Sequence, residues 1–114
     1  MKLNHVYKTF YPDTPKEVKA LSDINLTFEK GEFTTLSGES GSGKTTLLNI
    51  IGGLDSATSG EIFFEGEEIT AYSEEKMAKL RLQDIGFIFQ AYNLIHVLTV
   101  RENMGFIMKL LKFN

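Results

Sequence analysis

A glycine-rich octapeptide carries the strongest chemical signal in the sequence. Residues 38–45 read Gly-Glu-Ser-Gly-Ser-Gly-Lys-Thr and satisfy the pattern G-x-x-x-x-G-K-[ST] at every fixed position. Glycines let a backbone approach a polyphosphate closely, with its N–H groups turned toward the anion. A helix beginning at the end of the loop would add unpaired amides and the positive end of its dipole. The pattern therefore predicts a phosphate-binding loop.

Three side chains at the end of this loop are suited to a nucleotide. The Lys44 ammonium suits the β- and γ-phosphates, the Thr45 hydroxyl suits Mg²⁺, and Thr46 could add contacts to the α-phosphate. A dinucleotide-binding pattern that starts at Gly41 would need a glycine at position 46, so the sequence does not support one. Guanine-recognition sequences of the Asn-Lys-x-Asp kind are absent, which favours ATP over GTP.

Other residues that could do chemistry do not form a pattern. The chain has no cysteine, which excludes disulfides, thiol catalysis and cysteine metal sites. Neither His5 nor His96 has a second metal-binding residue at a suitable spacing. Glu67 and Glu68 are most simply interpreted as the solvated face of a turn.

Composition narrows the class of protein further. The 114 residues are 42% hydrophobic and 24% charged, as in a soluble globular domain that can bury a core. With 12 Lys and Arg against 15 Asp and Glu, the net charge of −3 disfavours a nucleic-acid partner. The first residues do not resemble a secretory signal, and no apolar run approaches the roughly 20 residues of a membrane span. We therefore expect a soluble, intracellular domain.

Strand and helix signals alternate along the chain, which predicts an α/β fold. Strands are expected over residues 3–7, 24–28, 32–37, 61–64, 67–69 and 85–89. Helices are expected over residues 45–51, after a cap at Ser73, and after a capping box that begins at Thr99. The phosphate loop would then lie between a strand and a helix, the context that its motif requires. No stop signal follows the last helix, which suggests truncation.

The order of these motifs resembles the ATP-binding subunit of ABC transporters over nearly all 114 residues. Besides the phosphate loop, the segments that carry the resemblance are 20–26, 31–33, 46–55, 58–62, 85–90 and 93–94. The Gly-Gly-Leu-Asp and Leu-Arg segments look most like the lipoprotein-release and macrolide-export subgroup. The resemblance implies a P-loop NTPase fold of the ABC ATPase type: the N-terminal part of the nucleotide-binding core with an antiparallel β subdomain. It also implies ATP and Mg²⁺ as cofactors.

The resemblance assigns roles to residues at two further places. Gln90 matches the glutamine of the Q-loop, which joins the Mg²⁺ shell and senses the attacking water, so the implied catalytic residues are Lys44 and Gln90. The implied metal ligands are Thr45 and Gln90. An aromatic residue near the end of the first strand stacks on adenine in this family; Phe10 fits best, and Tyr11 remains an alternative. The remaining implied nucleotide-binding residues are Gly38, Glu39, Ser40, Gly41, Ser42, Gly43, Lys44, Thr45 and Thr46.

Residues 94–100 would lie where the family contacts its transmembrane permease, although simple core packing would also explain their apolar character. The resemblance implies this permease and a second ATP-binding subunit as partners. It also implies a cytoplasmic location at the inner face of the cell membrane, through the permease.

Several parts of the family pattern are absent from the 114 residues: the Leu-Ser-Gly-Gly-Gln signature, an apolar strand ending in Asp-Glu, and the switch histidine. We therefore expect residues 1–114 to be the N-terminal portion of an ABC ATP-binding domain, truncated after the Q-loop region and inactive in hydrolysis by itself. An alternative is a non-hydrolytic nucleotide-binding or interaction module. A small P-loop kinase would need lid arginines, and only Arg81 and Arg101 are available.

Overall fold

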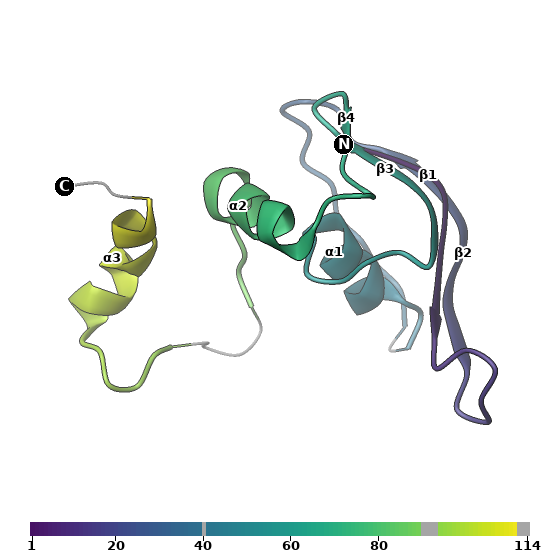
Figure 1. Ribbon diagram of the computed structural model, residues 1–114, viewed down its shortest axis with the longest axis horizontal. Coiled ribbons are helices and arrows are strands. Elements are labelled where there is room, and N and C mark those ends of the chain that lie inside the picture. The colour runs from purple at the N-terminus through teal and green to yellow at the C-terminus, as the bar shows by residue number, and fades with distance from the viewer. Residues whose placement is uncertain (40, 90–93, 112–114) are drawn as a thin grey trace. The chain divides into compact units, whose positions relative to one another are not determined.

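The computed structural model describes residues 1–39, 41–89 and 94–111, which divide into two compact units. The first unit, Met1–Ser73, contains strands β1 (Lys2–Phe10), β2 (Val18–Thr27), β3 (Ser59–Phe64) and β4 (Glu67–Glu68) and helix α1 (Lys44–Ile51). The second unit, Glu74–Asn114, contains helices α2 (Glu74–Asp84) and α3 (Val100–Leu110) (Figure 1).

The four strands form one antiparallel sheet in the order β2-β1-β3-β4. β3 and β4 are joined by Glu65 and Gly66, with φ angles of 51° and 80°. Two successive positive φ values are typical of the tight turns whose twist matches that of a hairpin. The sheet confirms the antiparallel β subdomain expected from the sequence.

A bulge in β1 places two of its side chains at the centre of the core. Leu3 and Val6 are both fully buried, although positions three apart on a regular strand face opposite sides. The register shifts between these residues, and His5 between them has a φ of 48°. The extra residue turns both side chains inward. Gly60 on β3 lies against this bulge, where a Cβ would stand 2.4 Å from the His5 carbonyl oxygen.

Helix α1 adds the second layer of this core. Leu47 and Ile50, three positions apart, lie on one face of the helix and are buried. The strands and the residue directly after β4 contribute the other buried apolar residues, namely Leu3, Val6, Leu21, Ile62 and Ile69. Burying each such side chain stabilises the fold by about 1.5–3 kcal/mol. The helix ends at Ile51, as expected, and Gly52 caps its C-terminus.

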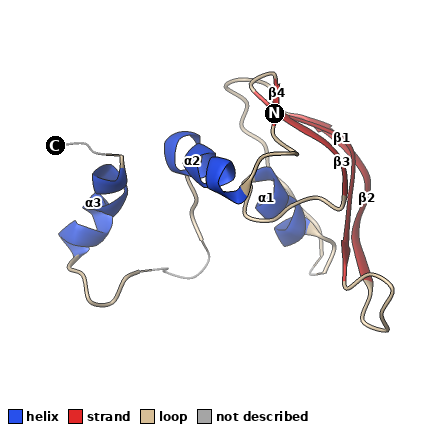
Figure 2. Cartoon of the chain, viewed as in Figure 1, coloured by secondary structure: helices blue, strands red, loops and turns tan. Residues whose placement is uncertain are grey.

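Two expected strands are wrong: residues 32–37 and 85–89 form no strand (Figure 2). A strand is held by hydrogen bonds to a neighbouring strand, and the sheet of the described residues pairs with neither segment. Their apolar side chains are correspondingly exposed: Phe33 is 92% exposed and Ile88 fully so. The phosphate loop is therefore followed by the expected helix but is not preceded by a strand.

Both expected helices of the second unit are present. α2 begins at Glu74, directly after Ser73, and has Glu74 and Glu75 in its first turn. α3 begins after Thr99, whose side chain accepts from the Glu102 amide while the Glu102 carboxylate accepts from the Thr99 amide. This is the predicted capping box. Within the described part of the chain, no helix is long and apolar enough to cross a membrane.

Candidate nucleotide site

The phosphate loop folds into a tight turn that ends at the first residue of α1. The Ser42 amide donates to the Glu39 carbonyl oxygen at 3.1 Å, and Gly43 caps the helix with a φ of 94°. A Cβ at Gly43 would lie 2.8 Å from the Ala20 carbonyl oxygen on β2. Only glycine accommodates both this φ and this close backbone approach. Gly43 therefore lets the end of the loop pack closely against β2, the edge strand of the sheet.

The first turn of α1 presents the groups that a phosphate requires. The Leu47 amide donates to the Gly43 carbonyl oxygen at 2.9 Å. The amides of residues 44–46 come before this first helical hydrogen bond, so they have no acceptor within the helix. No acidic residue lies in this turn to repel an anion. The Lys44 ammonium donates to the Gly38 carbonyl oxygen, so this hydrogen bond keeps the positive charge beside the first residue of the loop.

A hollow of about 530 Å³ joins the loop to the ends of β1 and β2. Its lining residues are Phe10, Val18, Lys19, Ala20, Gly41, Gly43, Lys44, Thr45 and Thr46. Phe10 pairs with Val18 in the sheet, so the far ends of these strands form one wall and the loop forms the other. The structure thus brings together Phe10, Lys44 and Thr45 as neighbours of one hollow.

Tyr11, the alternative to Phe10, lies in a different environment. It does not line this hollow, is 65% exposed, and has a φ of 51° at the start of the turn after β1. Phe10 is the aromatic residue of the hollow. Its contact with adenine remains a prediction.

The structure describes some of the other predicted site residues and not others. Gly38, Glu39 and Ser42 are exposed along the loop. Ser40 and Gln90 lie outside the described residues, so the structure does not place them. No group of three or more His, Cys, Asp or Glu side chains that could hold a metal ion occurs in the described ranges. The Thr45 hydroxyl at the hollow nevertheless fits Mg²⁺ that arrives with phosphate oxygens, because Mg²⁺ commonly takes few protein ligands.

Sequence reasoning missed two lysines beside the site. Lys19 pairs with Thr9 and brings a second cation to the lining of the hollow. Lys8 contacts the ring of Phe10, with its Nζ atom 5.0 Å from the ring centroid. The alternation of β1 puts residues 8 and 10 on one face and could have indicated this pair.

Comparison with known proteins identifies the family. The sequence profile described as ABC transporter matches residues 21–113, which is most of the chain. The chain belongs to the ABC transporter family. Its phosphate loop and α1 fall inside the matched segment, and its β1, with Phe10, precedes it.

Several curated ABC proteins are similar over most of this chain. An ATP-binding protein of Staphylococcus haemolyticus named for hemin import, HrtA, is 46% identical over 96% of the chain and 48% of its own length. The lipoprotein-releasing system ATP-binding protein LolD 1 of Rhodopseudomonas palustris is 44% identical over 91% of the chain and 46% of its own length. This chain therefore spans about half the length of these relatives.

A solved structure shows the same fold. The ATP-binding cassette MJ0796, a protein of Methanocaldococcus jannaschii, was solved as a dimer in a post-hydrolysis state with ADP and Pi. It is 40% identical to this chain and superposes with a TM-score of 0.89 over 99% of the chain and 48% of its own. The architecture is thus that of part of an ABC ATPase, as the sequence predicted.

Proposed function

We propose that residues 1–114 are the N-terminal portion of the ATP-binding subunit of an ABC transporter. The observation that supports this most directly is the hollow in which the phosphate loop, the start of α1 and Phe10 meet. A loop with free amides and a lysine suits a polyphosphate, and an aromatic ring at the other wall suits a base. This arrangement accommodates a nucleoside triphosphate.

Each part of the hollow has a role in this proposal. The loop amides and the Lys44 ammonium bind the phosphates, Phe10 stacks on the adenine, and the Thr45 hydroxyl joins the shell of the Mg²⁺ that accompanies ATP. Gln90, which lies outside the described residues, would join the Mg²⁺ shell and sense the attacking water, as its match to the Q-loop glutamine implies. Hydrolysis further depends on the signature, the Asp-Glu strand and the switch histidine of a complete dimer, none of which is in this sequence.

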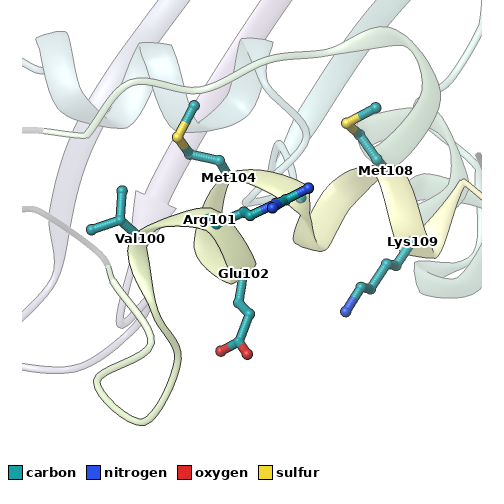
Figure 3. Close-up of a pocket in the computed structure, with 7 residues that line it drawn as sticks. Val100, Arg101, Glu102, Met104, Met108 and Lys109 are labelled. Atoms are coloured by element: carbon teal, nitrogen blue, oxygen red, sulfur yellow. The ribbon is translucent and has the colours of Figure 1, made fainter.

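The energy-coupling role requires a surface for the permease. Leu94, Val97 and Val100 are exposed just before or at the start of α3. A second hollow, of about 700 Å³, lies along α3 itself and is lined by Val100, Arg101, Glu102, Met104, Gly105, Met108 and Lys109. Figure 3 shows the two methionines on one side of the helix and Glu102 and Lys109 on the other. Exposed apolar clusters of this kind are typical of protein interfaces.

We propose residues 94–100 as the contact with a transmembrane permease of the lipoprotein-release or macrolide-export type. The protein would then lie at the cytoplasmic face of the membrane. A second ATP-binding subunit would complete its sites.

Titration calorimetry with MgATP tests the nucleotide site. The 114-residue chain should bind ATP, and Lys44→Ala should weaken binding at least tenfold, because a hydrogen-bonded charge contact is worth about 1.5–3 kcal/mol. Lys79→Ala is a matched control, because Lys79 is an exposed lysine on α2 and not part of the hollow. Equal affinity of the parent chain and Lys44→Ala would contradict the proposal.

A further inference from the structure

Lys8 makes a set of contacts beside the nucleotide hollow that ATP binding by itself does not require. Its Nζ atom lies 3.2 Å from Asp55 Oδ1 and donates to the Ser56 carbonyl oxygen at 2.8 Å. The same atom lies 5.0 Å from the centroid of the Phe10 ring. Only 12% of the Lys8 side chain is exposed. A strand lysine that could extend into water is instead folded against an aspartate, a carbonyl and an aromatic ring.

Asp55 is itself fixed to the end of α1. The amides of Leu54 and Asp55 both donate to the Asn49 carbonyl oxygen, at 2.8 and 3.2 Å. The Asp55 carboxylate also accepts from the Ser56 amide at 2.8 Å. The position of this carboxylate is therefore set by the last turn of the helix whose first turn forms the phosphate site.

The segment around Asp55 is also joined to the end of β1. The Thr58 amide donates to the Tyr7 carbonyl oxygen at 2.8 Å, and the Thr9 amide donates to the Thr58 hydroxyl at 2.9 Å. Lys8 lies between these two attachment points on the strand. The Lys8–Asp55 pair thus connects α1, which holds the phosphate loop, to the strand that ends at Phe10.

Phe10 lines the hollow, whereas Lys8 does not. The ammonium therefore contacts the ring without forming part of the lining that faces a ligand. We propose that Lys8, held by Asp55, is a positioning residue that fixes the Phe10 ring for stacking on the base of the bound nucleotide. A ring that is already fixed loses less side-chain freedom on binding, and the attraction between a cation and an aromatic face supplies that restraint. The inference rests on the proposed ATP site and adds a determinant of base recognition to it.

The test compares MgATP with magnesium tripolyphosphate, which has the phosphates but no base. The measured quantity is the ratio of the two dissociation constants, obtained by calorimetry on the 114-residue chain. Phe10→Ala should reduce the preference for ATP by roughly 5- to 150-fold, the range for loss of one stacked base. Lys8→Met and Asp55→Asn should each reduce it by roughly 2- to 5-fold, the range for a cation–aromatic contact. Tripolyphosphate affinity should stay unchanged in all three variants.

Two further variants separate positioning from general stability. Lys8→Arg keeps the charge and should keep the preference for ATP, while Lys2→Met removes an exposed lysine of the same strand and should change nothing. Adding Lys8→Met to Phe10→Ala should cause no further loss, because the lysine acts through the ring. Circular dichroism establishes that each variant is folded, and Asp55→Asn, which can still accept from the Ser56 amide, tests the inference where Lys8→Met does not fold.

The outcomes distinguish this inference from the proposed function. An unchanged ATP preference in both Lys8→Met and Asp55→Asn overturns the positioning role alone. A further loss on adding Lys8→Met to Phe10→Ala also overturns it. If the parent chain shows no Lys44-dependent ATP binding, the nucleotide site is wrong and the positioning role is overturned with it.

Discussion

Gly43 is the residue on which the shape of the phosphate loop depends most directly. We predict that Gly43→Ala weakens MgATP binding by roughly 5- to 150-fold, because holding a non-glycine residue at a strained φ costs about 1–3 kcal/mol. The added methyl group would also press on the Ala20 carbonyl oxygen. Gly86→Ala is the matched control, since a Cβ there meets no atom within 4 Å. Calorimetry that gives equal affinities for the two variants would contradict this account of the loop.

Asp23 on β2 contacts His5 at the bulge of β1, and this contact changes its titration. His5 Nδ1 lies 2.7 Å from Asp23 Oδ1, and hydrogen bonds from His5 and Asn25 lower the pKa of this carboxyl group below its ordinary value. Because the pKa of Asp23 is lower in the folded chain, its ionised carboxylate stabilises the fold at pH values above the ordinary pKa. This stability is lost as the pH falls through the lowered pKa. We predict that His5→Ala raises the pKa of Asp23, as measured by NMR titration of its carboxyl carbon. A pKa of Asp23 that His5→Ala leaves unchanged would disagree with the structure.

At the scale of elements, α3 depends on its capping box. We predict that Thr99→Ala lowers helix stability by about 1 kcal/mol, because the Glu102 amide loses its acceptor. Faster amide hydrogen exchange in the first turn of α3 would report the change. Thr99→Ser keeps the hydroxyl and should exchange almost as slowly as the parent chain. Equal exchange in Thr99→Ala and Thr99→Ser would show that the cap does not hold this helix.

The elements that could be predicted from sequence are those whose determinants are local. Local signals of this kind are the capping residue Thr99, the glycines after α1 and the turn at Glu65 and Gly66. The expected helices after Thr99 and over 45–51, and the expected strands on either side of the turn, are all present. The segments 32–37 and 85–89 have strand-forming residues but form no strand. Pairing partners are distant in sequence, so residue preferences cannot show whether a neighbouring strand is present.

The residues of the candidate site likewise differ in whether they depend on local sequence or on contacts between distant segments. The octapeptide is contiguous, so its pattern indicated a phosphate loop directly. Phe10 was found through a resemblance to a family, and its place beside the loop depends on the pairing of β1 with β2. Lys8 and Asp55 are 47 positions apart in the sequence, and no motif connects them. Only the folded chain shows that they meet.

At the scale of the whole molecule, catalysis requires more than the nucleotide hollow. Phosphoryl transfer to water depends on several groups that position the nucleotide and stabilise charge at the same time. The first unit supplies the loop, Lys44 and Thr45. We predict that the 114-residue chain binds MgATP but does not hydrolyse it above the level of its Lys44→Ala variant, because the signature and the Asp-Glu strand are not in its sequence.

A steady-state phosphate-release assay checks this prediction, with the ATP-binding cassette MJ0796 measured in parallel as a family member of known fold. The parent chain and Lys44→Ala should release phosphate at the same background rate, even at ATP concentrations that saturate the calorimetric binding curve. Faster release by the parent chain than by Lys44→Ala would show that the first half of the site performs the chemistry by itself. That result would overturn the dependence on downstream residues but would leave the nucleotide site in place, because turnover that depends on Lys44 requires bound ATP.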